Sequence, residues 1–181
     1  AAARKKVAAP PAEAPRAEAP ANNTLTLGYL HEPRELAPSR PYFDPLPADE
    51  GVQGARLGIR DDNTTGSFTR QHFELIEAEV PITEDPANAL KGLLARGTRF
   101  VLVDLPAERI LQLADLPEAR EILLLDVANR DDRLRGRDCR KNLVYLQPSH
   151  AMRGDALAQY LSKKRWNKWL LIQGASDADR R

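Results

Sequence analysis

The sequence predicts an α/β fold built on a doubly wound, mostly parallel sheet. Two runs carry the prediction: residues 99–106 (RFVLVDLP) and residues 121–127 (EILLLDV) each combine continuous apolar positions with an acid near the end. Such runs are typical of strands buried on both faces of a parallel sheet, so Val101 and Leu102 are expected to be buried on opposite faces. A helical pattern over residues 85–97 precedes the first run and another follows it directly, so helix and strand alternate. Ligands of such sheets bind at the carboxyl ends of the strands, where function is therefore expected.

Composition narrows the classes of function. The chain has 181 residues, of which 42% are hydrophobic, enough for one domain with a buried core. Lys and Arg total 27 against 26 for Asp and Glu, a balance that predicts neither nucleic acid nor an anionic membrane as a partner. No apolar run approaches the roughly 20 residues of a membrane-spanning helix, so no membrane insertion is expected. The single cysteine, Cys139, excludes an internal disulfide and a cysteine-based zinc site.

Three segments are predicted along the chain. Residues 1–23 repeat alanine, proline and glutamate and are expected to form a disordered linker, a tether of the kind that follows an export signal. Residues 24–147 are expected to form an N-terminal α/β lobe. Residues 148–181 are expected to be the crossover and the first helix and strand of a second, incomplete α/β lobe.

The first strand of the lobe is expected over residues 24–30 (TLTLGYL). The loop that follows, residues 31–47, contains five prolines and is therefore stiff and irregular. Loops that leave the carboxyl end of a strand are common binding elements, so His31, Tyr42 and Phe43 are expected either to face a ligand or to pack the loop onto the domain.

The first crossover helix is expected over residues 49–63, where Val52, Ala55 and Ile59 share one face. The sequence NTTG at residues 63–66 is expected to end this helix in a turn.

The remaining strands are predicted from alternation and from a short apolar run. Residues 72–82 alternate apolar and charged positions, as a strand near a sheet edge does. The helix after this strand is expected to begin at the N-cap Asp85 and to end at Gly97. Residues 142–146 (NLVYL) supply the fifth strand, after a charged loop over residues 130–141. Six basic and three acidic residues in that loop favour either an anion site or a solvated, self-paired surface.

A helix and a strand are predicted again after the fifth strand. Ser149 is the expected N-cap of a helix that continues to about residue 165. Residues 168–174 (KWLLIQG) are expected to form a buried strand, and Ser176 is expected to cap a further helix. The stripe of apolar residues along the first of these helices comprises Met152, Ala156, Leu157, Tyr160 and Leu161.

Residues suited to catalysis are few. His31, His72 and His150 lack the spacing of metal ligands, and the sequence contains no phosphate-binding glycine loop, dinucleotide fingerprint or serine nucleophile elbow. Asp104 lies where a receiver domain carries its phosphoacceptor, but the end of the first strand, GYLHE, lacks the acidic pair of that site. The residues predict no enzyme activity, no metal and no cofactor; a receiver-like signalling module and a non-transport α/β enzyme domain are the alternatives.

Two blocks of sequence carry a resemblance to a known family. Residues 54–68 (GARLGIRDDNTTGSF) and, more specifically, residues 131–174 resemble the substrate-binding proteins of ABC transporters, in the subfamily associated with PQQ-dependent alcohol oxidation. More broadly, residues 25–174 resemble the type I periplasmic binding fold. The resemblance implies a periplasmic, two-lobed receptor that closes on a small organic solute and passes it to a membrane permease, without a reaction of its own.

The resemblance and the fold together place one side of a ligand cleft at the carboxyl ends of the strands. Leu105, Pro106 and Ala107 stand where the amino-acid receptors of this fold carry small hydroxyl residues, which argues against amino acids as ligands. The residues expected to line the edge of the cleft are His31, Tyr42, Asp104, Leu105, Pro106, Asp126, Ala128 and Asn129.

Overall fold

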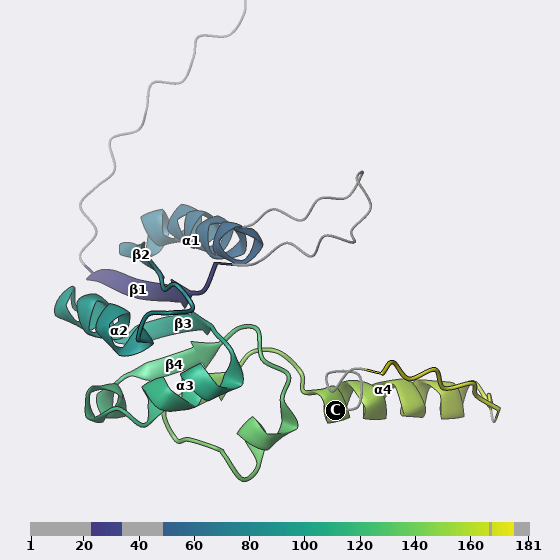
Figure 1. Cartoon of the computed structure of the whole chain (residues 1–181). Coiled ribbons are helices and arrows are strands. Elements are labelled where there is room, and N and C mark those ends of the chain that lie inside the picture. Colours follow the sequence, from purple (N-terminus) through teal and green to yellow (C-terminus); the bar gives the residue numbers. More distant parts are fainter. Residues whose placement is uncertain (1–22, 34–48, 167, 176–181) are drawn as a thin grey trace, which may run out of the picture.

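The computed structural model describes residues 23–33, 49–166 and 168–175 (Figure 1). The predictions made for the linker up to residue 22, for Tyr42 and Phe43, and for Ser176 fall outside the described residues. None of the described helices is long and apolar enough to cross a membrane.

The described residues form one sheet of five strands, all parallel, in the order β2-β1-β3-β4-β5. Within the described strands the pairing continues without a bulge from strand to strand. Leu102 of β3, for example, pairs with Tyr29 of β1 on one side and with Leu125 of β4 on the other. The strands are β1 (Asn23–His31), β2 (Gln71–Glu79), β3 (Phe100–Asp104), β4 (Leu123–Asp126) and β5 (Leu143–Tyr145).

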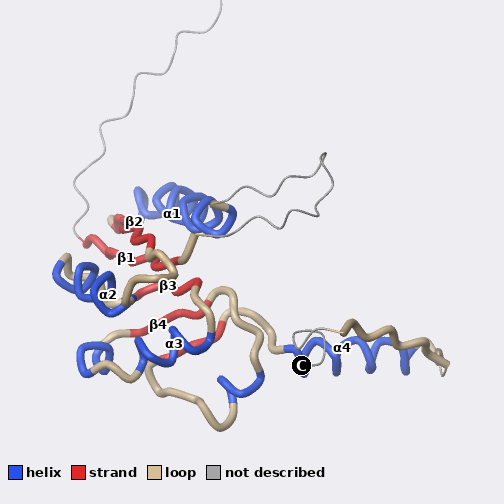
Figure 2. The backbone as a smooth tube through the Cα atoms, in the orientation of Figure 1, coloured by secondary structure: helices blue, strands red, loops and turns tan. Residues whose placement is uncertain are grey.

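Helices cover the sheet on both sides, as Figures 1 and 2 show. Helix α1 lies on one face, while α2 and α3 lie on the other. This is a Rossmann-like fold with the flavodoxin strand order, in which the direction of winding changes between β1 and β3. The described residues contain four α-helices, α1 (Glu50–Thr69), α2 (Pro86–Ala95), α3 (Ala107–Ala114) and α4 (His150–Lys163), and two short 3-10 turns, η1 (Pro117–Glu121) and η2 (Asp132–Arg135).

The hydrophobic core lies between the sheet and the pair α2 and α3. Val101 and Val103 of β3 are fully buried there, but Leu102 between them is only half-buried. The expectation that this strand is buried on both faces is therefore wrong. The physical reason is that α1 packs over β1 and β2, and no described helix covers β3, β4 and β5 on that side.

Helix α1 continues past the predicted turn and ends at Thr69. Its NTTG sequence joins the helix to β2: the side chain of Asn63 donates to the carbonyl of Phe73 (2.9 Å) and accepts from its amide (2.8 Å). A Cβ on Gly66 would lie 2.4 Å from the carbonyl oxygen of Gln71, so glycine is needed for the close approach. The NTTG sequence therefore lies within α1 and packs the helix against β2. The turn predicted at residues 63–66 is wrong.

Both predicted ends of α2 are confirmed. The carboxylate of Asp85 accepts from the amide of Ala87 (2.9 Å), and Pro86 occupies the first helical position. Gly97 has a φ of +85°, the left-handed conformation that follows many helices.

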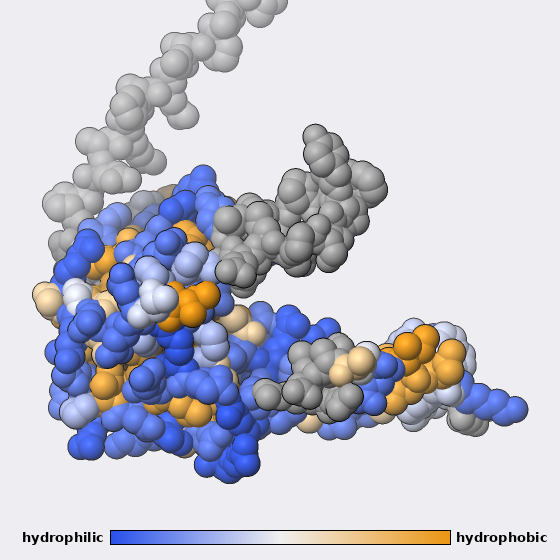
Figure 3. All heavy atoms as spheres, viewed as in Figure 1, coloured by the Kyte–Doolittle hydropathy of each residue, from blue (hydrophilic) through white to orange (hydrophobic). Residues whose placement is uncertain are grey.

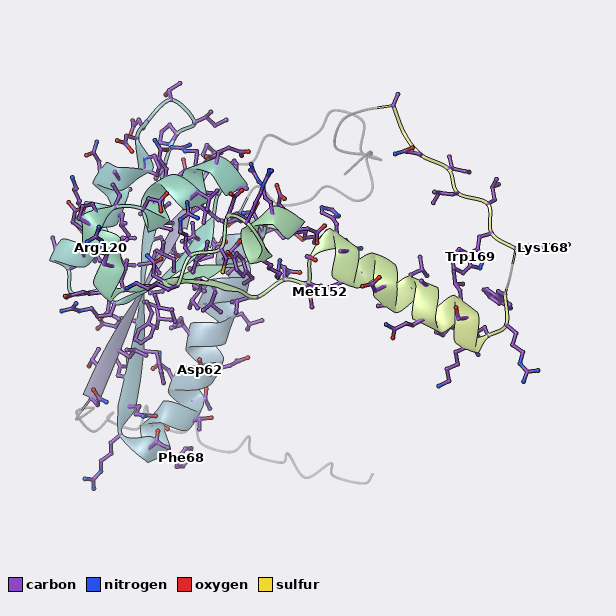
Figure 4. The ribbon with its side chains drawn as sticks, turned by 90° about the horizontal axis from the view of Figure 1, so that it is seen from below. Asp62, Phe68, Arg120, Met152, Lys168 and Trp169 are labelled. Atoms are coloured by element: carbon purple, nitrogen blue, oxygen red, sulfur yellow. The ribbon has the colours of Figure 1, made fainter. Side chains whose placement is uncertain are left out.

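Helix α4 begins where predicted, but it contributes no buried residue. Ser149 caps it by accepting from the amide of Met152, and the helix then projects from the sheet (Figure 4). Its stripe is exposed; Leu157, for example, is 59% exposed.

The strand predicted over residues 168–174 is wrong: within the described residues this segment has no strand neighbour and no regular structure. Its apolar side chains gather at the end of the projecting arm (Figure 3), and Leu171 is 90% exposed. A strand needs backbone partners as well as apolar side chains, and the described chain offers none here.

Candidate functional site

The carboxyl edge of the sheet holds a cavity of about 440 Å³, here called the edge pocket. It forms where the chain leaves β3 and β4, and the first residue of α4 closes its far side. Its lining consists of Pro106, Ala107, Glu108, Ala128, Asn129, Arg130, Asp131, Asp132 and His150. Three residues predicted for the cleft edge, Pro106, Ala128 and Asn129, are therefore brought together in one cavity.

Asp126 shapes the pocket without lining it. Its side chain is fully buried, and its Oδ1 accepts from the amides of Ala128 (3.2 Å) and Asn129 (2.9 Å). The side-chain amide of Asn129 in turn donates to the carbonyl of Leu105 (2.6 Å). Asp126 Oδ2 has no hydrogen-bond partner among the described residues. The carboxylate thus positions the loop after β4, and the Asn129 amide ties that loop to the start of α3.

Leu105 does not face the pocket. Its side chain is buried in the core beside Ile110, so only its backbone contributes to this edge. Alternation explains the placement, because Leu105 continues the buried face that Val101 and Val103 present along β3.

The first turn of α4 is bound to the loop after β4. The amide of Ala151 donates to both oxygens of Asp132 (3.1 and 3.2 Å), and the amide of His150 donates to the carbonyl of Arg130 (2.9 Å). A hydrogen bond from Ser149, followed by the bond from Ala151, holds the pKa of Asp132 below its ordinary value. Asp132 and His150 were missed by sequence reasoning. Ser149 marked the start of α4, but β5 lies between Asp132 and Ser149, so no local signal joined the two.

Basic residues of the charged loop pair with acids of the loop itself and with acids of α3 and its C-cap. Arg133 binds the carboxylates of Glu108 and Asp131, and the hydrogen bond with Glu108 is the main reason that the pKa of Arg133 is raised. Arg140 forms two hydrogen bonds to Asp115 (2.6 and 3.1 Å). Of the two interpretations of this loop, the self-paired surface is the one that these contacts favour.

A second hollow lies at the switch between β1 and β3. His31 and Asp104 are register neighbours, as their shared edge predicts, and the hydroxyl of Tyr29 donates to Asp104 Oδ2 (3.3 Å). The hollow has a volume of only about 10 Å³, about enough for one water molecule. A Cβ on Gly51 would lie 2.3 Å from the Tyr29 hydroxyl, so α1 begins in tight contact with this cluster.

Beside this hollow, on the α1 side of the sheet, a groove of about 280 Å³ runs between the helix and β3; we call it the α1 groove. Leu102 and Val127 form its floor, and Gly54 and Ala55 form its wall. Polar groups are confined to the end of this groove at the carboxyl edge, where Glu50 and Asp104 lie.

No protein-family model matches the chain, and a search of curated proteins finds no relative. The fold and the geometry of the edge therefore have to support any function by themselves.

Proposed function

We propose that the chain is a solute-binding lobe of a periplasmic receptor that delivers a small organic solute to the permease of an ABC transporter. The observation that carries the proposal is the edge pocket: its volume of about 440 Å³ falls within the roughly 300 to 1,000 Å³ of small-molecule sites. It also lies at the carboxyl ends of parallel strands, where ligands of such sheets bind. In this proposal the chain binds the solute and carries out no reaction.

The charges of the pocket indicate the class of solute. The three carboxylates of the lining already have partners: two bind Arg133, and the third accepts from a backbone amide at the base of α4. A lining whose carboxylates are paired favours a neutral solute over an ion. The Asn129 side chain and the His150 ring can exchange hydrogen bonds with hydroxyl groups. A neutral alcohol or polyol fits this lining better than a carboxylate, in agreement with the proposed link to alcohol oxidation.

The cluster around Asp104 favours a receptor over a receiver-like module. Tyr29 and Gly51 pack against the Asp104 carboxylate, and the described residues that line the hollow and the α1 groove include no lysine, serine or threonine to bind a phosphoryl group. Phosphorylation of Asp104 by a small phosphodonor would nevertheless support the signalling alternative. Turnover that is lost in Asp104→Asn or Asp126→Asn would support an enzyme.

The proposal is tested by following backbone amide shifts during titration with alcohols, polyols, amines and carboxylates. We expect a neutral hydroxylated solute to shift the amides of Ala128, Asn129 and His150 with a dissociation constant in the millimolar range, because one lobe covers only part of its ligand, about 4 kcal/mol of binding. Asn129→Ala should weaken binding about tenfold, equivalent to about 1.4 kcal/mol.

The matched control is Asn88→Ala, which removes the same amide from the exposed surface of α2 and should leave binding unchanged. Melting curves of both variants separate lost binding from lost folding. If no solute shifts the edge-pocket amides, or if carboxylates bind better than polyols, the proposal is wrong.

A further inference from the structure

The face of the sheet beside α1 is apolar and largely uncovered. Parallel pairing places Leu102, Leu125 and Val144 side by side on this face. Val127 and Leu146 follow two positions farther along the chain, just after β4 and β5 end. Val144 is 39% exposed and Leu146 is 55% exposed, whereas their neighbours on the opposite face belong to the core. We call these five residues the open sheet face. All-parallel sheets are normally covered on both faces, so this surface lacks a layer.

A helix could supply the missing layer. The open sheet face meets the α1 groove, whose wall is built from small residues of α1: Gly51, Gly54 and Ala55. Gly58 follows Gly54 one helical turn later. A Cβ added at Gly54 or Gly58 would meet no atom within 4 Å, so there is open space along this side of α1. Small residues let a second helix approach closely. A helix can therefore lie on the open sheet face, alongside α1.

The same chain carries an uncovered helix of the required kind. The α4 stripe, defined as Met152, Ala156, Leu157, Tyr160 and Leu161, is apolar and contributes no buried residue. Fourteen residues of helix extend about 21 Å, which spans a five-residue strand of about 17 Å.

The direction of α4 is set by bonds at its base. The amide of Leu146 donates to the carbonyl of Asp126 (2.9 Å), Arg135 binds the carbonyl of Gln147, and Asp132 holds the amide of Ala151. With these bonds in place α4 points away from the sheet (Figure 4), and its stripe does not reach the open sheet face of its own chain.

Charge supplies an orientation for α4 on a second molecule. The end of α4 is basic, with Lys163, Lys164 and Arg165 in succession. The carboxyl edge beside the α1 groove carries Glu50 and Asp104. At the amino edge, Arg99 and Lys141 precede β3 and β5, while Arg120 and Glu121, before β4, offset each other. The basic end of an incoming α4 is therefore attracted to the carboxyl edge and repelled from the amino edge.

We propose that two copies of this chain associate, with the α4 stripe of each copy lying on the open sheet face and in the α1 groove of the other. The arrangement is reciprocal, as a two-fold symmetric dimer requires, and it covers both apolar surfaces at once. This inference concerns a different surface from the edge pocket and does not rest on the proposed function.

The test is the mass of the full chain in solution, measured by sedimentation over a wide range of concentration. We expect a concentration-dependent dimer. Gly54→Leu puts a side chain into the groove from a position where an added Cβ meets no atom within 4 Å, and it should weaken the dimer about tenfold or more. The control is Gly92→Leu, the same change on α2, where an added Cβ also meets no atom within 4 Å; the dimer should be unaffected.

A change on the helix tests the other half of the interface. Leu157→Glu should also weaken the dimer about tenfold or more, while Ser162→Glu, on the side of α4 opposite the stripe, should not. Circular dichroism shows whether each variant is folded, which is expected because α4 has no buried residue.

A cross-link distinguishes the second copy from other occupants. In a Cys139→Ser background, one population carries Gly54→Cys and another carries Leu157→Cys; a disulfide dimer should form only when the two are mixed. A disulfide within single chains that carry both cysteines would show that α4 folds back onto its own sheet. That result would overturn the proposal, and so would a monomer at every concentration. The proposal would also be wrong if the dimer were lost only in Leu171→Glu, a change outside α4, or if α4 bound anionic vesicles in place of a second copy.

Discussion

Helices α3 and α4 have similar sequence patterns, but α3 buries its apolar side chains and α4 leaves them exposed. Each follows a strand and a proline at the carboxyl edge, and each has an apolar stripe. Helix α3 buries Ile110 and Leu113 completely, whereas α4 leaves Leu157 and Tyr160 more than half exposed. An amphipathic pattern shows that a helix has a face to cover, but the bonds at its base decide which surface it meets.

The largest expected effect comes from comparing Ile110 of α3 with Leu157 of α4. Ile110→Ala should lower the free energy of unfolding by about 2 to 5 kcal/mol, because it removes packed methylenes and leaves a cavity. Leu157→Ala should cost less than about 0.5 kcal/mol in dilute solution, where the chain is monomeric. Denaturant unfolding measures both. A loss of several kcal/mol for Leu157→Ala would show that α4 packs on its own chain.

The same contrast can be drawn within α1, between two glycines. Gly66→Ala places a Cβ 2.4 Å from the carbonyl oxygen of Gln71 and should destabilise the protein by about 1 to 3 kcal/mol. Gly58→Ala meets no neighbouring atom and should stabilise it by about 0.5 to 1 kcal/mol, because alanine loses less backbone freedom on folding. Thermal unfolding of the two variants should therefore shift in opposite directions, and equal shifts would contradict the close contact at Gly66.

A smaller effect is expected on the open sheet face. A strand buried on both faces would make Leu102→Ala cost about 2 to 5 kcal/mol, but Leu102 is half-buried, so we expect about 1 to 2 kcal/mol. Leu124→Ala, on the covered face of the next strand, should show the full loss. If both variants lose the same stability, the open sheet face is covered in solution.

The smallest effect concerns the base of α4. Because the pKa of Asp132 is lowered in the folded chain, its contribution to stability is complete above the unfolded value of about 3.9 and is lost as pH falls through the lower folded value. The amide resonance of Ala151 should report this transition during an acid titration. The transition should vanish in Asp132→Asn and remain in Asp155→Asn; its presence in both would assign it to another group.

Much of the fold could be predicted because its signals are local. The alternation of helix and strand, the cap at Asp85, the left-handed Gly97 and the cap at Ser149 each depend on a few neighbouring residues. The end of α1 could not be predicted, because Asn63 is held by Phe73 and not by its own neighbours.

The strand expected over residues 168–174 failed for a related reason. Its apolar run satisfies the local pattern, but the partners that a strand needs are supplied only by tertiary structure.

The edge of the sheet that holds the candidate site could be predicted, but most of the side chains that line it could not. Strand ends indicated the edge of the sheet at which His31, Asp104 and Asn129 lie. They could not show that Leu105 turns into the core or that His150 closes the edge pocket from another helix. Such facts depend on side-chain direction and on how distant segments meet.

The contact between Asn63 and Phe73 has a consequence for growth of the sheet beyond this molecule. Strand β2 is an outer strand, and unpaired backbone groups on outer strands are where fibre-like aggregation starts. The Asn63 side chain occupies both the amide and the carbonyl of Phe73, as an added strand would. A strand from another molecule therefore cannot form hydrogen bonds to β2 at Phe73, because the Asn63 side chain already occupies both backbone groups. A single asparagine of α1 protects this position of the edge strand.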